Sequence, residues 1–277
     1  MSLADKYFIA TCKDILENGV WDKGMNVRPR WEDGTPAYTI KKFGVVHRYN
    51  LQEEFPLTTI RKTAWKSAID EILWMWQKKS NNVNELSSHI WDAWANEEGS
   101  IGKAYGYQLG VKHKYKEGLF DQVDRVLFDL KHNPSSRRII TNLYNHSDLN
   151  EMALAPCAYS MTFNVTGNKL NGMLNQRSQD MLTAGCGFNE FQYSALLAMM
   201  AQVSGFEAGE FIHVIADTHI YDRHIPIVEE LIKREPKAAP IVEIDGDIKD
   251  FYKFTVDSFQ VKEYQTHDFK EKIEVAV

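Results

Sequence analysis

Cysteine is scarce in this sequence of 277 residues, which contains Cys12, Cys157 and Cys186 and no Cys-x-x-Cys pair. Three scattered cysteines exclude a disulfide framework and a zinc knuckle. The sequence also lacks an apolar run near the roughly 20 residues of a membrane-spanning helix. Its first residues lack the basic and apolar segments of a secretory signal. These absences predict a protein of the reducing cytoplasm that has no membrane partner.

Linker composition and the common nucleotide-binding motifs are absent as well. The 8 prolines and 16 glycines are spread along the chain, and we find neither an internal repeat nor a low-complexity segment. We therefore expect one domain over residues 1–277. The phosphate loop G-x-x-x-x-G-K-[ST], the dinucleotide motif G-x-G-x-x-G and the nucleophile motif G-x-S-x-G are all missing.

The composition that is present is that of a globular protein, with 44% apolar and 25% charged residues. The formal net charge is -6. An acidic surface argues against a protein that coats nucleic acid or an anionic membrane. It leaves room for a local basic pocket that binds one phosphate.

Hydrophobic periodicity predicts a mixture of helices and strands. Helical spacing of apolar residues covers residues 4–18, 64–78, 121–132, 188–205 and 220–234. Strand-like segments cover residues 38–51, 138–143, 159–165, 169–175 and 211–215, with two or three further short strands after Pro240. Because helices and strands do not alternate regularly, we predict an α+β fold.

Cys157 follows a proline in the segment ALAPCAY, and two interpretations of it are open. A lone cysteine is most often a small buried hydrophobic residue. The alternative is a nucleophile, which reacts as the thiolate and therefore needs cationic neighbours or a helix terminus to lower its pKa. The position in the sequence does not decide between them.

Glu71 and four arginines are further candidates for chemistry. Glu71 lies in a predicted aromatic helix, where a buried carboxylate requires a partner or performs proton transfer with a raised pKa. Arg137 and Arg138 are adjacent, and Arg28 and Arg177 lie in polar segments. The guanidinium fork suits a phosphate, although any one arginine is more often a solvated surface charge.

The segment Asp217–Tyr221, with His213 and His224 nearby, has the residue types of a metal site. The histidines lack the i, i+4 spacing of a helix-borne zinc site, and no cysteine is close. We therefore predict no metal and expect these groups to hydrogen-bond a polar ligand. Trp91 and Trp94 either line a site for a flat ring or fill the core, which is the commoner role of paired tryptophans.

Taken in order along the chain, these segments resemble the thymidylate synthase family, whose members methylate dUMP with a folate. The resemblance runs over nearly the whole chain. It is carried by Glu71-Ile72-Leu73-Trp74, Ile90-Trp91-Asp92-Ala93-Trp94, Ala104-Tyr105-Gly106, Pro134-Ser135-Ser136-Arg137-Arg138, Met152-Ala153-Leu154-Ala155-Pro156-Cys157, Gln176-Arg177-Ser178, Phe188-Asn189 and Asp217-Thr218-His219-Ile220-Tyr221. It implies an α+β fold of mixed sheets packed with helices, and a homodimer formed through a sheet.

The resemblance also implies covalent catalysis. The thiolate of Cys157 would add to carbon 6 of the uracil ring, so that carbon 5 becomes nucleophilic and attacks the methylene group of 5,10-methylenetetrahydrofolate. Glu71 would transfer protons through ordered water, and the products would be dTMP and dihydrofolate. The implied catalytic residues are Cys157, Glu71, Tyr105, Asn189 and Asp180.

The binding residues implied by the resemblance form two groups. The nucleotide group comprises Arg28, Gln176, Arg177, Ser178, Asn189, His219 and Tyr221, with Arg137 and Arg138 donated across the dimer interface to the phosphate. The folate group comprises Trp91, Trp94, Asp180, Gly185, Phe188 and Val277. Asparagine at position 189, where related enzymes that act on cytosine carry aspartate, favours a uracil substrate.

The sequence departs from the family pattern on the folate side. Residues 181–189 read MLTAGCGFN, which lacks the proline of the family pattern and is one residue longer than that pattern. Ala158 replaces a histidine that is common in the family after the cysteine, and Ala216 replaces the glycine that usually precedes Asp217. These departures leave open a second function, that of a dUMP hydroxymethylase, in which water adds to the methylene intermediate in place of the hydride. Trp91, which in the family helps to exclude water, favours the synthase. A non-catalytic nucleotide- or RNA-binding relative is a third reading, opposed by Cys157, Glu71, the four arginines and the acidic charge.

Overall fold

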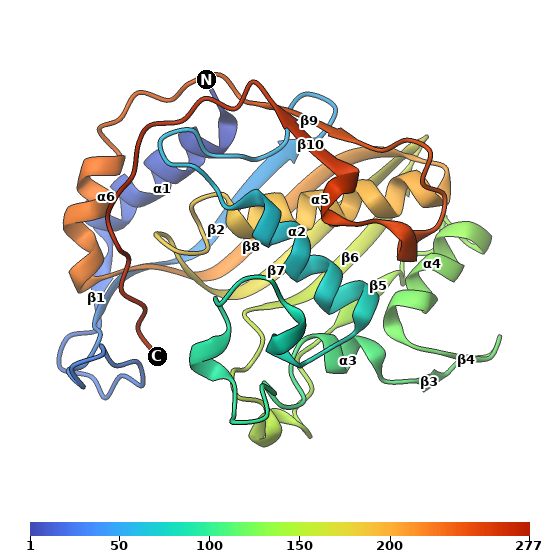
Figure 1. Cartoon of the computed structure of the whole chain (residues 1–277), viewed down its shortest axis with the longest axis horizontal. Coiled ribbons are helices and arrows are strands. Elements are labelled where there is room, and N and C mark those ends of the chain that lie inside the picture. Colours follow the sequence, from blue (N-terminus) through green and yellow to red (C-terminus); the bar gives the residue numbers. More distant parts are fainter.

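A six-stranded sheet forms the base of the molecule in the computed structural model, which describes residues 1–277 (Figure 1). The strand order is β1-β2-β8-β7-β6-β5. The strands are β1 (Val20–Trp21), β2 (Thr39–Asn50), β5 (Ile140–Asn142), β6 (Ala158–Thr166), β7 (Lys169–Asp180) and β8 (Glu207–Tyr221). All neighbours are antiparallel except β7 and β8, which run parallel.

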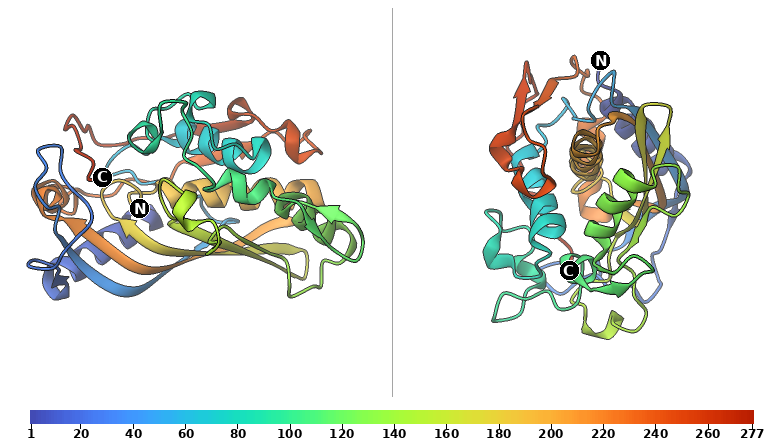
Figure 2. Two further views of the ribbon diagram at one scale, coloured as in Figure 1. Left: turned by 90° about the horizontal axis from the view of Figure 1, so that it is seen from below. Right: turned by 90° about the vertical axis from the view of Figure 1, so that its right-hand side faces the viewer.

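The helices cover one face of this sheet in layers. Helix α5 (Phe188–Ser204) packs on β7 and β8, and α2 (Trp65–Leu73) packs on α5 (Figure 2). Helix α1 (Leu3–Asn18) lies beside them on β2. The smaller elements are α3 (Gly106–Gly110), α4 (Gln122–His132), α6 (Ile225–Leu231), the pair β3 (His113–Lys114) and β4 (Leu119–Phe120), and the pair β9 (Ile241–Ile244) and β10 (Phe259–Lys262). No helix combines the length and apolar character needed to cross a membrane.

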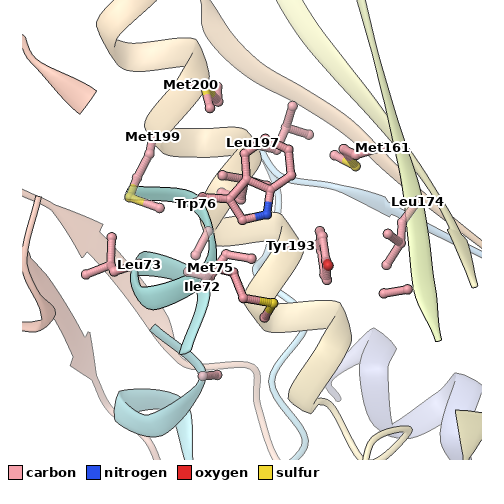
Figure 3. Close-up of a cluster of buried hydrophobic side chains, with 14 of the residues drawn as sticks. Ile72, Leu73, Met75, Trp76, Met161, Leu174, Tyr193, Leu197, Met199 and Met200 are labelled. Carbon is pink, nitrogen blue, oxygen red and sulfur yellow. The ribbon is translucent and has the colours of Figure 1, made fainter. Parts of the chain in front are cut away.

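The main core lies between α2, α5 and the inner face of the sheet. Figure 3 shows Trp76, from the turn after α2, among Leu197 and Tyr193 of α5 and Met161 and Leu174 of the sheet. Every residue of α5 from Glu190 to Ala201 is buried, which explains why this helix is apolar all round.

The opposite face of the sheet carries no helix (Figure 2). Along its strands buried and exposed residues alternate, as the two-residue period of a strand requires. Val46, Ile140 and Met173 lie on the uncovered face and are 52%, 54% and 38% exposed, respectively. A broad apolar sheet face is thus left without a partner within the chain.

The α+β fold is confirmed, but several element boundaries differ from those predicted. Strands β7 and β8 continue through the polar ends of the predicted strands, because the two parallel strands go on pairing as far as Asp180 and His219. The helix predicted over residues 220–234 is wrong at its start: β8 continues to Tyr221, and α6 begins at Ile225. The helix predicted over residues 64–78 changes to a π-helical turn at Trp74.

Candidate active site

Cys157 lies directly before β6, half-buried, with a guanidinium beside its sulfur. Arg177 comes from the neighbouring strand β7, and its Nη2 is 3.6 Å from Cys157 Sγ. The arginine is held there because Nε donates to the carbonyl of Pro156 (3.0 Å) and Nη2 to that of Ala155 (2.6 Å). Burial raises the pKa of the Cys157 thiol, while Arg177 and Arg28 act in the opposite direction. The structure therefore assembles the cationic neighbourhood that a thiolate requires.

Tyr105 fixes the backbone of this cysteine. Its phenol oxygen accepts a hydrogen bond of 2.9 Å from the Cys157 N–H. Tyr105 has a φ of +45°, a conformation that costs energy in a residue with a side chain and is held by its surroundings. Gly106 follows, and a Cβ there would overlap the carbonyl oxygen of Ser80. The close approach of these two loops sets the position of the tyrosine.

Glu71 is a buried acid on α2, only 4% exposed. Gln192 of α5 donates a hydrogen bond of 3.0 Å to its Oε1, whereas Oε2 has no partner. Burial raises the pKa of Glu71 to about 7, even though the bond from Gln192 lowers it. The pKa of Tyr193 is raised by burial first and then by the charges of Glu71 and Cys157. Glu71 and Cys157 therefore both lie near Tyr193. Glu71 is thus an acid that titrates near neutral pH, as a proton-transfer group should.

A chain of amides connects the start of α5 to this acid. Gln176 of β7 donates through Nε2 to Asn189 Oδ1 at 3.2 Å. Asn189 Nδ2 in turn donates to Gln192 Oε1 at 3.3 Å. Asn189 is in the first turn of α5 and remains partly exposed, so its amide has one acceptor site and one N–H left for a ligand.

Asp180 ends β7, and its carboxylate organises the unusual segment that follows. It accepts hydrogen bonds from the Leu182 N–H at 3.0 Å and from Thr183 Oγ1 at 2.7 Å. The N–H of Gly185 binds the carbonyl of Asp180 at 2.9 Å. Burial opposes ionisation of Asp180, but His224 and Thr183 hold its pKa below the usual value. The segment therefore folds as a turn on Asp180 and delivers Phe188 to the start of α5.

The carboxyl ends of the parallel strands bring the nucleotide candidates together. Ser178 pairs with Asp217 and Asp180 with His219 in the β7–β8 register. His219 Nδ1 is 2.8 Å from Asp217 Oδ1, and the ring of Tyr221 stands edge-on to that of His219. Ligand sites favour this edge of parallel strands.

Aromatic residues form the wall next to Tyr105. The rings of Trp91 and Tyr105 are 5.0 Å apart, and those of Trp91 and Trp94 are 5.7 Å apart. Both indole N–H groups are buried without a hydrogen-bond partner. The indole of Trp91 also lies near Glu71, where it acts to lower the pKa of that buried carboxyl group. Val277 pairs with Arg30 through two backbone hydrogen bonds of 2.8 and 3.0 Å, which lays the last residues on the loop that carries Arg28.

The remaining arginines are not joined to the cysteine within one chain. Arg137 and Arg138 are exposed just before β5, and neither side chain forms an ion pair or hydrogen bond in the structure. Arg28 is exposed in the loop before β2 and acts on Cys157 only through its charge. Of the four arginines, Arg177 is the one that hydrogen-bonds Cys157.

Sequence reasoning missed Gln192 and Glu190, two buried polar residues of this region. Gln192 binds Glu71, and Glu190 contacts His213 at 3.2 Å. His224, which was expected to bind a polar ligand, lies 3.8 Å from Asp180. A lone carboxylate inside an apolar helix was the signal for Glu190. His47, Glu190 and His213 are also the residues whose ligand atoms lie close enough, within 4.8 Å of one another, to hold a metal ion; Asp217 and His219 do not belong to that group.

Comparisons with known proteins agree along the full chain. The family model described as thymidylate synthase matches residues 6–277. Thymidylate synthase 1 of Bacillus spizizenii is 46% identical and the thymidylate synthase of Bacillus phage phi3T 47% identical, each over 282 residues and 100% of both chains. The solved structure of thermostable thymidylate synthase A from Bacillus subtilis superposes with a TM-score of 0.93 at 46% identity and covers 99% of both chains. This chain belongs to the thymidylate synthase family.

Proposed function

We propose that Cys157 is the nucleophile in the reaction of this chain, which is the reductive methylation of dUMP to dTMP. The co-substrate, 5,10-methylenetetrahydrofolate, supplies the one-carbon unit and the hydride. The observation that carries this role is the pairing of Cys157 Sγ with Arg177 Nη2 at 3.6 Å. A guanidinium stabilises the thiolate, and addition of the thiolate to carbon 6 of the uracil makes carbon 5 a nucleophile.

Glu71 is the proton-transfer group in this proposal. Its pKa, raised to about 7 by burial, lets it both accept and donate a proton near neutral pH. Its unpartnered Oε2 is free to bind a water that reaches the pyrimidine. Tyr105 holds the backbone of Cys157 and so keeps the sulfur in place while the ring reacts.

The nucleotide is held by groups from four segments. Gln176 and Gln192 each use one hydrogen-bonding position of the Asn189 amide. The amide therefore keeps one acceptor position and one N–H, which match the N3–H and the O4 of uracil. His219 and Tyr221 would bind the sugar hydroxyl. The phosphate would be bound by Arg28, Arg177 and Ser178, with Arg137 and Arg138 from the second subunit.

The folate side is formed by aromatic and backbone groups. Trp91 and Trp94 would stack on the pterin and exclude water from the reacting carbon. Asp180 would position the ring from the turn that it organises, beside Gly185 and Phe188. Val277 would close the site from the end of the chain.

The family is dimeric, and we propose the uncovered sheet face as the interface. Exposed apolar residues on this face (Val46, Ile140 and Met173) form the kind of patch that a second subunit covers. Ile140 follows Arg137 and Arg138 closely in the sequence, so pairing through this face would carry both arginines toward the partner. A single domain over residues 1–277 and a cytoplasmic location remain part of the proposal. The three cysteines are all free, which suits a reducing compartment.

A product assay tests the proposed chemistry. The protein is mixed with dUMP and 5,10-methylenetetrahydrofolate, dihydrofolate is followed by absorbance, and the nucleotide is identified by mass. We expect dTMP and dihydrofolate in equal amounts. Hydroxymethyl-dUMP without dihydrofolate would contradict the synthase; every relative named above is a thymidylate synthase, so nothing in the comparisons favours that outcome.

The Cys157→Ser variant isolates the nucleophile. Serine keeps the size and hydrogen bonding of the side chain but is a far weaker nucleophile at neutral pH. We expect turnover to fall by about a thousandfold or more while dUMP still binds, as measured by titration calorimetry. Substantial residual turnover would remove Cys157 from its role.

A further inference from the structure

Three buried polar side chains meet between the sheet and α5 and have no part in the reaction proposed above. His47 of β2 and His213 of β8 are directly opposite each other in an antiparallel pair, so both side chains lie on the same face of the sheet. Glu190, in the first turn of α5, reaches them from the covering layer. The exposed fractions of His47, Glu190 and His213 are 3%, 2% and 0%. Three elements thus bring two imidazoles and one carboxylate to one point of the core.

The spacing of these side chains is close to that of ligands around a zinc ion. Glu190 Oε1 is 3.2 Å from His213 Nδ1 and 3.9 Å from His47 Nδ1. The ligand atoms of all three residues lie within 4.8 Å of one another. Tetrahedral zinc, with bonds of about 2.0–2.1 Å, separates its ligand atoms by roughly 3.4 Å. An ion therefore fits among them after small movements of the side chains.

The far side of His213 fixes which of its nitrogens is available. Gln176 Nε2 donates to the carbonyl of Ser178 at 2.9 Å, so the amide turns its Oε1 toward His213 Nε2, which lies 2.9 Å away. An amide oxygen accepts, and Nε2 of the ring therefore carries the hydrogen. In the neutral imidazole Nδ1 is then a lone pair that points at the carboxylate of Glu190. Two acceptors that face each other in this way need a cation between them.

The other two side chains are also supported from behind. His47 Nε2 lies 3.0 Å from Thr11 Oγ1, and when this nitrogen donates to the hydroxyl, Nδ1 is a second lone pair. Gln179 Nε2 donates to Glu190 Oε1 at 3.1 Å. Histidine and carboxylate ligands of metals are typically oriented by such outer hydrogen bonds. All three side chains therefore have the support that metal ligands have.

Three polar atoms of the cluster are buried without a hydrogen-bond partner: His47 Nδ1, Glu190 Oε2 and Gln179 Oε1. A buried polar atom without a partner costs free energy, and such atoms are uncommon in folded proteins. A proton on His213 Nδ1 would satisfy the contact with Glu190 and leave these three atoms as they are. A divalent cation engages both imidazoles and the carboxylate at once, and Gln179 Oε1 is near enough to the carboxylate to serve as a fourth ligand.

We propose that His47, Glu190 and His213 form a structural zinc site that ties β2, β8 and α5 together. Two imidazole nitrogens and one carboxylate oxygen are a donor set that suits zinc. Because the site is closed to solvent, the ion enters as the chain folds and contributes to stability. The sequence gave no sign of the site, since the three residues are far apart in the chain and meet only in the fold. The proposal does not depend on the reaction, and its test does not use turnover.

Metal analysis of the protein tests the proposal. The chain is purified without an affinity tag, because a histidine tag binds zinc, and its zinc content is measured by mass spectrometry; we expect about one zinc per chain. A sample is then unfolded in urea with a chelator, desalted, and refolded with or without Zn²⁺. At equal protein concentration, Zn²⁺ should raise the midpoint of thermal unfolding by roughly 5 °C or more. A purified chain without zinc that also shows no shift after refolding with Zn²⁺ would overturn the proposal.

His47→Gln and Glu190→Gln identify the ligands. Each variant is close in size to the wild type and removes one ligand, so either can test the site if the other does not fold. We expect zinc to bind at least roughly a hundredfold more weakly in each, because loss of an outer partner alone costs ten- to a hundredfold. The shift in the thermal midpoint should disappear as well.

His89→Gln is the matched control. It removes an exposed histidine that also lies beside a carboxylate, with Nδ1 at 2.9 Å from Asp92 Oδ2, and it should keep the zinc and the thermal shift. Loss of zinc in this variant would place the ion on the surface. Zinc retained in both His47→Gln and Glu190→Gln would place it elsewhere, such as on Cys157. Either result contradicts the buried site.

Discussion

Glu71 illustrates at the scale of one residue how a buried acid, the group that we propose for proton transfer, costs stability. Its pKa is raised from 4.5 to about 7 because the side chain is buried. In acid the carboxyl group is protonated in both the folded and the unfolded states, and burial carries no charge penalty. Above pH 7 the folded state must hold a buried anion that the unfolded chain ionises freely. The difference corresponds to roughly 3 kcal/mol in favour of unfolding.

Glu71→Gln should therefore stabilise the protein in a pH-dependent way. We expect the free energy of unfolding in urea to rise by up to about 3 kcal/mol at alkaline pH and to change little near the unfolded pKa of 4.5. The glutamine oxygen can still accept the bond from Gln192. Turnover should fall by roughly a hundredfold or more because the variant lacks the carboxyl group that we propose for proton transfer. Glu97→Gln makes the same change at an exposed position and should alter stability by less than about 0.5 kcal/mol. A gain in stability that does not depend on pH would contradict the burial argument.

At the scale of elements, the site depends on how closely α3 approaches the end of α2. After Leu73 the helix widens to a π-turn, and Lys79 ends it in the left-handed conformation with a φ of +54°. Ser80 then faces Gly106 with no room for a Cβ. Since Tyr105 directly precedes this contact and binds the Cys157 N–H, packing between two elements sets the position of Cys157.

Gly106→Ala should disturb both the fold and the site. We expect a loss of about 2 kcal/mol or more of unfolding free energy, because the new methyl group overlaps backbone atoms that cannot rotate away. The rate of turnover should fall more than dUMP binding, since Tyr105 moves relative to Cys157. Gly246→Ala is the control: a Cβ there meets nothing within 4 Å, so stability and turnover should stay at the wild-type level. Equal behaviour of the two variants would show that the contact with Ser80 is unimportant.

The elements also show what could be predicted from the sequence and what could not. Helix α1 was predicted within a residue or two because its apolar residues recur at a helical period, and helix α5 because its apolar run is too long for a strand. The polar ends of β7 and β8 were left out, since Gln176 to Asp180 do not look like a strand until a parallel neighbour pairs with them. The site residues in those ends came from family resemblance and not from periodicity. The Glu190–His213 pair was missed because its partners are 23 residues apart and meet only in the folded chain.

At the scale of the whole molecule, the phosphate site that we propose is shared between two chains. The protein carries a formal charge of -6, so a doubly charged phosphate is attracted only where arginines collect. Within one chain Arg177 faces Cys157, while Arg137 and Arg138 are exposed and unpaired. A symmetric dimer through the uncovered sheet face would supply to each site the arginines that its own chain lacks.

Mixing two inactive variants tests this shared site. Cys157→Ser lacks the nucleophile and Arg138→Ala lacks one donated arginine, so each homodimer should have little activity. In the hybrid dimer one site receives both defects, and the other combines the intact Cys157 of one subunit with the intact Arg138 of the other. After equal amounts are unfolded and refolded together, half of the dimers are hybrids with one intact site of two, and activity should return to about a quarter of the wild-type value. If Arg138 served the site of its own chain, every site in every dimer would keep one of the two defects, and mixing would restore nothing.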